Sequence, residues 1–445
     1  MTAEDRTSDA DAPGHTGSSA GSSVGFSTGY RHYILAVLTA MYVTNYLDRQ
    51  ILNILLPPIK AEFHVSDALL GLLAGPTFAL FYATLGIPIA RLADRSNRRN
   101  IIAVSMGLFS VMTVVCGMAA QFWQLLIARV FTGVGEAGTG PSAQAIISDL
   151  YPPQKRAAAQ SFYAAGLNIG LLIAAFAGGW IAQHYGWRKA FLAAGLPGLL
   201  LCIIVLLTVQ EPPRGHSESL ADDQEAPDLK TVARYLWAQR SFRWIAIGAA
   251  MTSFGGYGAT AFMPAFLVRS HHLTLEQVGI IFAGIAGVGG WAGTFLSGVI
   301  ADRMGKRDVR WNMYVPICAA LVALPFQPVF YLADNTTVAI VAAIIPAAMG
   351  AVFLGPCVTM TQGLVPLRMR ATASALFLFI LNIIGLGLGP QTVGLLSTLL
   401  KPVLGADSLR YALLVGMVSG AAGALCYWRA SKTLKEDLAR VIRLF

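Results

Sequence analysis

An acid and a base stand next to each other inside a long apolar stretch of the chain. Asp48 and Arg49 lie within residues 33–57, a run long enough to cross a bilayer at about 20 residues per helix. Counting back from Pro57 at about 1.5 Å per residue places Asp48 roughly 13 Å inside this run. A charge at that depth costs about 2.5–3.5 kcal/mol on insertion scales, so such residues usually face a bundle interior or a water-filled path. The two side chains are therefore candidates for the working centre of a membrane transporter.

A second pair of opposite charges, Arg129 and Glu136, lies in another apolar run. They are 136 − 129 = 7 positions apart, close to two helical turns, so both fall on one face, about 10 Å apart along the axis. The predicted helix that contains Asp48 and the one that contains Arg129 run in opposite directions. All four charged side chains can then meet in one cluster within the membrane.

Two interpretations of this cluster are open. In the first, Arg49, Arg129 and Glu136 bind the substrate, because guanidinium forks suit the phosphate or carboxylate of an anionic head group. Asp48 and Glu136 would then couple transport to protons, since burial raises the pKa of a carboxyl group and a neighbouring arginine lowers it. In the second, the four charges form a static network that only holds the first helix against the fourth.

The composition is that of a membrane protein with several spans. Of the 445 residues, 55% are hydrophobic and 12% are charged, about half of the ~25% found in soluble proteins, and the mean hydropathy is +0.60. The net charge of +9 gathers in short loops, which favours membrane topology, so we expect no nucleic acid partner. The five cysteines have neither metal-ligand spacing nor a disulfide framework, and we expect no metal and no cofactor.

The apolar runs predict an all-α membrane protein with twelve transmembrane helices in two pseudo-symmetric six-helix bundles. The predicted spans are residues 31–57, 67–92, 99–120, 123–148, 157–183, 187–209, 243–268, 275–300, 311–332, 338–365, 371–398 and 408–430. The predicted divisions are a disordered cytoplasmic tail (1–29), the N-terminal bundle (30–209), a cytoplasmic linker (210–242), the C-terminal bundle (243–430) and a cytoplasmic tail (431–445). Within the linker, residues 228–240 can form a short surface helix.

Arginine and lysine are concentrated in the loops after the second and eighth spans. These loops are residues 91–99 and 301–307, whereas the turns near Gln121 and Asp334 carry no basic residue. Because loops rich in Lys and Arg stay on the cytoplasmic side, both termini are predicted to be cytoplasmic and the protein to lie in the inner membrane. Four basic residues fall on the opposite side: Arg188, Lys189, Arg269 and Lys401.

The two halves of the chain repeat one another. The Asp-Arg pair that begins at Asp94 returns at Asp302, 302 − 94 = 208 positions later. The triplet Leu167–Ile169 returns as Leu381–Ile383 after 381 − 167 = 214 positions. Landmarks in the same order at nearly the same offset indicate parallel half-repeats, a transporter plan in which the substrate path lies between the halves.

The loops that contain these pairs resemble the signature of the major facilitator superfamily, Gly-x-x-x-Asp-Arg-x-Gly-Arg/Lys-Arg/Lys. The second loop matches fully, and the first has Ala90 and Asn97 in place of the two glycines. Asn tolerates the left-handed conformation of a tight turn, so that exchange is mild. The matching residues are Gly298, Asp302, Arg303, Gly305, Lys306 and Arg307 in the second loop and Asp94, Arg95, Arg98 and Arg99 in the first. The resemblance covers nearly all of residues 30–430 and implies the fold of that superfamily.

Within the superfamily, the chain is most similar to bacterial members of the Spinster family. Three stretches carry this resemblance: Asn45–Arg49, Arg129–Ala137 and Pro141–Leu150. The family moves lysophospholipids or sphingosine-1-phosphate with proton coupling. The resemblance thus implies an amphiphilic, anionic lipid as substrate, with protons and membrane lipids as further partners, and we expect a monomer. Aromatic residues such as Phe78 and Tyr82 are candidates for a pocket around the lipid tail or for the core.

We interpret the charged residues of the two signature loops as gates. An aspartate at a helix end attracts the positive N-terminus of a neighbouring helix, here those that start near Ala157 and Ala371, and such contacts would close the cytoplasmic side. The alternative is that the arginines only set the topology. The proposed gating residues are Asp94, Arg95, Arg98, Asp302, Arg303 and Arg307.

Together these features predict a proton-coupled secondary transporter that works by alternating access. The sequence has no Walker loop, which would indicate ATP, and no nucleophile–base constellation, so we do not expect an enzyme. A multidrug:proton antiporter of the same superfamily is an alternative, but Gly170 is followed by Leu171 and not by the proline of its helix-5 signature. A carrier of organic anions or sugars and a receptor on a transporter scaffold are further alternatives.

Overall fold

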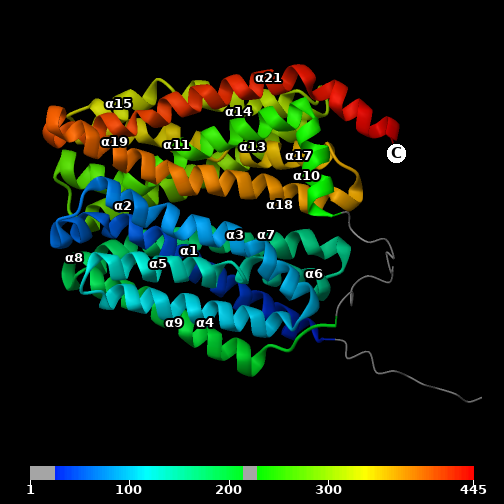
Figure 1. The fold of residues 1–445 in the computed structure, drawn as a ribbon, viewed down its shortest axis with the longest axis horizontal. Coiled ribbons are helices and arrows are strands. Elements are labelled where there is room, and N and C mark those ends of the chain that lie inside the picture. Colours follow the sequence, from blue (N-terminus) through cyan, green and yellow to red (C-terminus); the bar gives the residue numbers. More distant parts are fainter. Residues whose placement is uncertain (1–25, 214–227, 445) are drawn as a thin grey trace, which may run out of the picture.

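The computed structural model describes residues 26–213 and 228–444, which are helical and contain no strand. The first half contains α1 (Thr28–Phe63), α2 (Asp67–Ala74) with α3 (Pro76–Arg95), α4 (Arg98–Met118), α5 (Phe122–Glu136) with α6 (Thr139–Leu150), α7 (Pro153–Ile173) with α8 (Gly179–Tyr185), and α9 (Trp187–Thr208). The second half contains α11 (Arg240–His271), α12 (Leu275–Phe282) with α13 (Gly290–Gly305), α14 (Trp311–Ala323) with α15 (Phe326–Leu332), α16 (Thr336–Gly350) with α17 (Leu354–Gly363), α18 (Arg370–Leu381) with α19 (Gly389–Leu404), and α20 (Ser408–Leu413) with α21 (Val415–Leu444). These segments run roughly parallel to one long axis (Figure 1), which confirms the predicted all-α plan of six crossings in each half.

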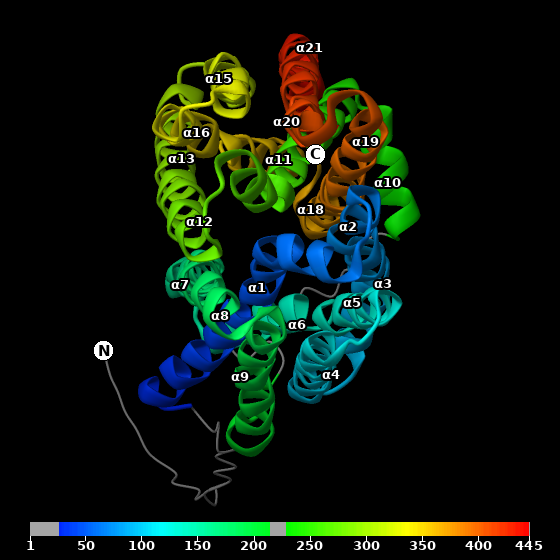
Figure 2. The same ribbon diagram turned by 90° about the vertical axis from the view of Figure 1, so that its left-hand side faces the viewer.

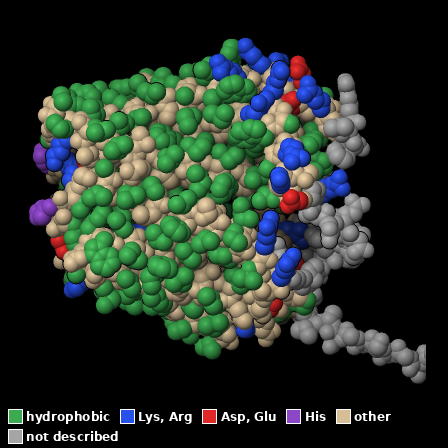
Figure 3. Space-filling model, viewed as in Figure 1, with side chains coloured by type: hydrophobic (Ala, Val, Ile, Leu, Met, Phe, Trp, Pro, Cys, Tyr) green, Lys and Arg blue, Asp and Glu red, His purple; other side chains and the backbone are tan. Residues whose placement is uncertain are grey.

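Seven described stretches are long and apolar enough to span a membrane by length and composition. One of them, Arg370–Val441, contains the last two crossings, and the helices that carry Asp48 and Arg129 are not among the seven. Between its two ends the molecule presents a largely hydrophobic side surface, and Lys and Arg side chains gather near the end that holds the C-terminus (Figure 3). The chain is thus built as a multi-pass membrane protein.

Local signals set the ends of the first helices. The hydroxyl of Ser27 accepts a hydrogen bond from the backbone N–H of Tyr30 and so caps α1. His64 ends α1 in the left-handed conformation (φ 52°), and Ser66 caps α2 by accepting a hydrogen bond from the backbone N–H of Leu69. The chain therefore turns sharply between α1 and α2.

The start of α1, the end of α21 and the described ends of the linker lie at one end of the bundle, which we call the linker end. The Tyr30 hydroxyl donates to the carbonyl of Thr208 (2.7 Å) and accepts from the N–H of Gln210 (2.8 Å), so the start of α1 is tied to the start of the linker. The predicted linker helix is confirmed as α10 (Leu229–Ala238), with Val232 and Leu236 buried. The predicted N-terminal tail lies outside the described residues up to position 25, and α21 continues through the predicted C-terminal tail to Leu444.

Among the described residues, the apolar core joins the two halves at the end opposite the linker and, in a smaller cluster, where Phe78 of α3 meets Leu386. At the end opposite the linker, one hydrophobic cluster contains residues of both halves, among them Leu55 of α1, Phe266 of α11 and Phe282 of α12. Nearer the linker end there are two separate clusters, one from α1, α4, α6, α7 and α9 and the other from α10, α11, α14, α17, α18 and α21. The halves are therefore packed together at the opposite end and separately packed at the linker end.

Glycines allow backbones of the two halves to touch at that opposite end, where α2 lies beside α19 and α8 beside α12 (Figure 2). A Cβ on Gly71 of α2 would lie 2.6 Å from the carbonyl oxygen of Pro390, and one on Gly75 would lie 2.5 Å from that of Gly387. Only glycine permits an approach this close.

Close packing against a glycine also gives a stability prediction for the contact between α4 and α5. A Cβ at Gly135 would lie 2.6 Å from the backbone nitrogen of Phe109, whereas nothing lies within 4 Å of a Cβ at Gly140. We expect Gly135→Ala to cost about 1–3 kcal/mol through overpacking and to lower the melting temperature in detergent. Gly140→Ala is the matched control and should melt like the wild type. Equal melting temperatures for the two variants would contradict this packing.

Candidate functional site

Asp48 and Arg129 form an ion pair inside the first half. The Arg129 Nη1 lies 2.5 Å from the Asp48 Oδ2, and the two side chains are 2% and 0% exposed. The Thr113 hydroxyl donates to the other carboxylate oxygen of Asp48 (3.0 Å). The pair thus connects α1, α4 and α5, and its opposite charges compensate each other in the interior of the protein.

Arg49 and Glu136 form a second ion pair beside the first. The Arg49 Nε donates to Glu136 Oε2 (3.0 Å), and the Arg49 Nη2 lies 2.7 Å from Glu136 Oε1. Two nitrogens of the guanidinium therefore bind the two oxygens of the carboxylate. The side chains are 15% and 5% exposed. The structure therefore brings all four predicted residues together as two crossed pairs, in which each residue of α1 binds one residue of α5.

Two aromatic rings of α3 support the guanidinium groups. The Arg49 guanidinium lies 4.7 Å from the ring centre of Phe78 and 4.5 Å from that of Tyr82, and the Arg129 guanidinium lies 5.1 Å from Phe78. Phe78 and Tyr82 are themselves stacked, with ring centres 5.5 Å apart. Cation–π contacts of this kind contribute about 0.5–2 kcal/mol each. The two rings, which the sequence placed in a tail pocket or in the core, hold the arginine side chains in position.

A small cavity borders the arginines at the contact between the two halves. Its volume of about 30 Å³ suits on the order of one or two water molecules. The lining comes from α1, α2, α3 and α5 of the first half and from α11 and the 382–390 stretch of the second half. The lining residues are Tyr46, Arg49, Gln50, Asn53, Ala74, Phe78, Arg129, Tyr257, Thr260, Ala261, Leu386 and Pro390. Arg49 and Arg129 therefore meet a polar space that both halves share.

Arg129, which lines this cavity, has one unused hydrogen-bond donor. Its Nε is buried and has no hydrogen-bond acceptor among the described residues, although another nitrogen of the same guanidinium binds Asp48. A buried donor without a partner is costly, so it is a natural contact for an acceptor that enters the cavity.

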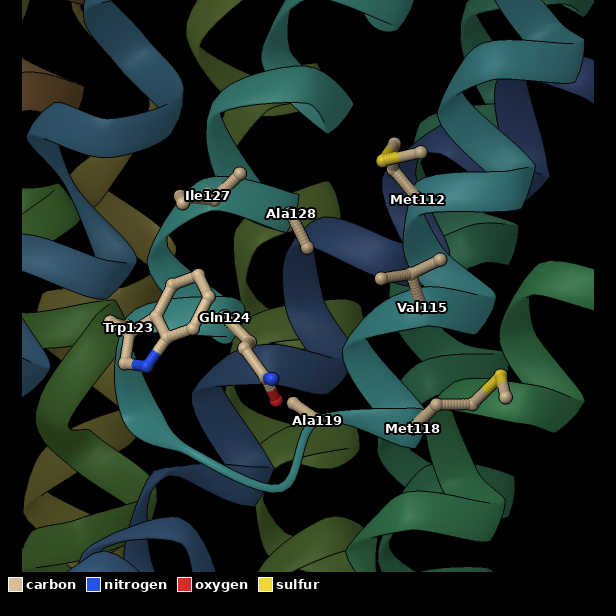
Figure 4. Close-up of a pocket in the computed structure, with 8 residues that line it drawn as sticks. All are labelled: Met112, Val115, Met118, Ala119, Trp123, Gln124, Ile127 and Ala128. Carbon is tan, nitrogen blue, oxygen red and sulfur yellow. The ribbon is translucent and has the colours of Figure 1, made fainter.

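A larger hollow lies elsewhere, on the surface between α4 and α5 (Figure 4). It has a volume of about 300 Å³ and an apolar lining apart from the amide of Gln124. The lining residues are Met112, Val115, Met118, Ala119, Trp123, Gln124, Ile127 and Ala128. None of the four ionised residues lines it, and it lacks the charged groups that would select an ionic head group.

The predicted gating residues lie at the linker end. Arg98 is buried and fastens the linker to the first half: it donates to Glu211 Oε1 (2.7 Å), to the carbonyl of Pro212 (2.9 Å) and to a carboxylate oxygen of Asp149. The three arginines Arg95, Arg303 and Arg307 are exposed. The side chains of Asp94 and Asp302 lie outside the described part of the chain. Gating by these residues stays a prediction.

The loop after α13 is tied to the last helix. Asp308 accepts hydrogen bonds from Arg310 (2.9 Å) and from Lys435 of α21 (2.9 Å). The hydrogen bonds from Arg310 and then from Lys435 hold the pKa of the Asp308 carboxyl well below its usual range. This contact stays within the second half.

Sequence reasoning missed one partner of the charged cluster, Thr113, and a polar contact near the cluster between Asn45 and Thr139. Thr113 binds Asp48, and the Asn45 amide donates to the Thr139 hydroxyl (2.8 Å) where α1 passes α6. The signal for Thr113 was weak, because a hydroxyl in an apolar helix can also bond to its own backbone, and Thr113 does so with the carbonyl of Phe109 as well.

The chain is similar to known proteins of one family of membrane transporters. A family model described as Major Facilitator Superfamily matches residues 38–390. A protein of Mycolicibacterium smegmatis described as an MFS-type efflux pump is 34% identical over 412 residues, which are 92% of this chain and 94% of that protein. Protein spinster homolog 3 of Danio rerio is 29% identical over 440 residues, covering 92% of this chain and 86% of that protein.

A solved structure is similar over nearly the whole length. It is described as a bacterial homolog of the human lysosomal transporter Spinster in an inward-facing and unoccupied conformation. It superimposes with a TM-score of 0.86 at 33% identity and covers 92% of this chain and 99% of that one. Because the family model matches most of the chain and these relatives cover nearly all of it, the chain belongs to the major facilitator superfamily of membrane transporters and, within it, to the Spinster family.

Proposed function

We propose that this protein is a proton-coupled secondary transporter of an amphiphilic, anionic lipid, such as a lysophospholipid or a sphingosine phosphate. One observation carries the proposal: two crossed ion pairs are buried beside a cavity to which both halves contribute. Four ionised groups at membrane depth are costly, and their position next to that cavity favours a transport role over simple helix pinning.

Competition for Arg129 would couple the substrate to protons. Arg129 lines the cavity and has an unused Nε, so a phosphate or carboxylate in the cavity can bind its guanidinium and displace Asp48. A displaced Asp48 would be a carboxylate without water or counter-charge, and it would take up a proton. Proton binding and head-group binding are then linked through one guanidinium.

Glu136 would play the same part for Arg49. Its carboxylate is held by two nitrogens of Arg49, and the Arg49 side chain lines the cavity directly. An anionic group that recruits Arg49 would leave Glu136 to accept a proton, so Glu136 serves the substrate site and the proton site together.

Alternating access fits the distribution of the core. The halves share a large hydrophobic cluster at the end opposite the linker and a small one that contains Phe78 and Leu386, and they have separate clusters at the linker end. We assign the linker end, where basic side chains gather, to the cytoplasm, which puts both termini there and the protein in the inner membrane. The conformation would then be closed on the outer side, in line with the inward-facing description of the solved Spinster homolog.

The partners follow from this assignment. We propose a monomer that is surrounded by membrane lipids, binds a lipid-like substrate and protons, and needs neither a cofactor nor nucleic acid. The signature-loop residues Asp94, Arg95, Arg98, Asp302, Arg303 and Arg307 would govern opening toward the cytoplasm.

A second candidate is export of drug-like compounds. The efflux pump of Mycolicibacterium smegmatis is 34% identical over nearly the full chain, which favours a multidrug:proton antiporter as the alternative. Melting temperatures measured with lysophospholipids, sphingoid phosphates and cationic drugs separate the two. We expect anionic lipids to raise the melting temperature and cationic drugs to leave it unchanged, because the arginines face the cavity. The reverse pattern would favour the drug antiporter.

Replacing Asp48 by Asn removes the proton site that we propose. In proteoliposomes, Asp48→Asn should abolish lipid uptake driven by a pH gradient, because an amide cannot cycle a proton. Exchange of labelled for unlabelled lipid without a gradient should persist and serves as the control for folding. Gradient-driven uptake at the wild-type rate would exclude Asp48 as the coupling residue.

Replacing Arg49 by Lys tests the head-group site. Lysine keeps the charge but loses the two-nitrogen contact with Glu136 and the contact of the guanidinium with the Tyr82 ring. We therefore expect the KM for an anionic lipid to rise by about tenfold. Arg188→Lys is the matched control, since Arg188 also stacks on an aromatic ring and binds a carboxylate, that of Glu62, but does not line the cavity. A similar KM change in both variants would show that the effect is not specific to the site.

A further inference from the structure

The last helix presents an outward face that changes from apolar to basic toward the linker end. Val418, Leu425 and Lys432 follow one another on α21 at intervals of 425 − 418 = 7 and 432 − 425 = 7 residues, so they share one side of the helix. All three side chains are exposed. Between Leu425 and Lys432 the helix rises by about 10 Å, which is close to the depth of the head-group region of a bilayer. This face therefore passes from the level of the acyl chains to that of the head groups.

Two tryptophan rings lie at this boundary, and each has a cation over its face. The Lys432 Nζ lies 3.5 Å from the ring centre of Trp428, and the Arg429 guanidinium lies 4.7 Å from that of Trp244 on α11. Trp428 is exposed. Because tryptophan is enriched where a membrane meets water, the two rings indicate that Arg429 and Lys432 lie at the level of the head groups.

Arg429 and Lys432 have no counter-charge within the part of the chain that the structure describes. They are one helical turn apart and both exposed, and no described carboxylate lies within ion-pair distance of either. Lys435, in the next turn, is by contrast paired with Asp308 (2.9 Å). Glu436 lies one turn beyond Lys432, farther from the apolar part of the face. Two neighbouring cations are thus available to an anion from outside the protein.

The contact between α11 and α21 holds this pair of cations in a fixed frame. The backbone N–H of Ser241 donates to Asp437 Oδ2 (2.8 Å), and the hydroxyls of Ser241 and Thr433 lie 2.8 Å apart. Asp437 is buried, so the start of α11 is fastened to the final turns of α21. Trp244, one turn after Ser241, is thereby positioned to receive Arg429 before any ligand binds.

The ligand of such a face must carry an anion next to an apolar chain. A nucleic acid or an acidic protein would meet the two cations but not the exposed Val418 and Leu425, whereas a phospholipid meets both. Guanidinium and ammonium groups both bind phosphate, and two of them favour a head group that has no positive charge of its own.

We propose that this face of α21 binds an anionic phospholipid of the surrounding membrane. Its phosphate would lie against Arg429 and Lys432, and its acyl chains would follow Leu425 and Val418. The inference rests on the membrane fold and on these contacts, and not on the substrate or the proton coupling proposed above.

Native mass spectrometry of the purified full chain, titrated with lipid in detergent, counts the bound phospholipid molecules. Phosphatidylglycerol supplies an anionic head group, and phosphatidylcholine with the same acyl chains supplies a neutral one. Arg429→Gln combined with Lys432→Gln should raise the Kd for phosphatidylglycerol by about tenfold or more and leave the Kd for phosphatidylcholine unchanged. Lys432→Gln alone should change the Kd in the same direction, which keeps the test valid if the double variant does not fold.

Lys435→Gln combined with Arg440→Gln is the matched control. It removes the same charge from the same helix, but Lys435 is paired with Asp308 (2.9 Å) and Arg440 lies 3.6 Å from Asp437. We therefore expect a Kd for phosphatidylglycerol close to that of the wild type. Lipid bound in the cavity beside the buried ion pairs is retained in both double variants, so the comparison isolates the face of α21.

Three results would overturn the proposal. The first is equal affinity of the wild type for the two lipids, and the second is an equal rise in Kd in both double variants, which would indicate a general attraction to positive charge. The third is displacement of phosphatidylglycerol by inorganic phosphate at the concentration of the lipid, because an anion without acyl chains would then suffice. The measurement involves no transport, so failure to transport any lipid would count against the proposed function alone.

Discussion

Ionised side chains that are kept from water must be matched by opposite charge, and this constraint shapes the first half of the protein. Asp48 is 0% exposed and Arg129 is 2% exposed, so each depends on the other for its counter-charge. The ion pair therefore fixes the rotation of α1 and α5 about their axes, because Asp48 and Arg129 must both face inward. Thr113 adds α4 to the same contact. In the same half, α3 packs against α5 and α7 packs against α1.

The surroundings of the cluster set it apart from a purely structural ion pair. In an ion pair that only links helices in a dry core, we expect every hydrogen-bond donor to have an acceptor. The Nε of Arg129 has no acceptor among the described residues, and Arg129 borders a water-sized cavity. The rings of Phe78 and Tyr82 contact the guanidinium groups of Arg49 and Arg129 through the ring faces. The N–H donors of these guanidinium groups can therefore exchange one acceptor for another. The cluster is thus stable in this conformation and open to competition from an anionic group.

The sequence predicted the cluster but not its pairing. Depth in an apolar run singled out Asp48 and Arg49, and the spacing of seven put Arg129 and Glu136 on one face, so their meeting followed from helix geometry. Which acid binds which base depends on the rotation and tilt of two helices, and no local pattern encodes these. Tertiary partners distant in sequence were missed for the same reason: Glu211 binds Arg98 from 113 positions away, and Arg269 binds Asp67 from 202 positions away. The crossings themselves were predicted well because apolar length is a local property. The break between α2 and α3 was not predicted, although Pro76 directly after Gly75 is a local signal for it.

The most direct measurement of the central idea is the protonation of Asp48 in the working protein. Infrared difference spectra of the protein in lipid, recorded on addition of a lysophospholipid, would detect a newly protonated carboxyl group, and Asp48→Asn would assign the band. We expect a protonated-carboxyl band in the wild type when the lipid binds and its loss in the variant. If Asp48 stays ionised in every condition under which lipid is transported, the buried pair is a static link between helices and proton coupling must lie elsewhere.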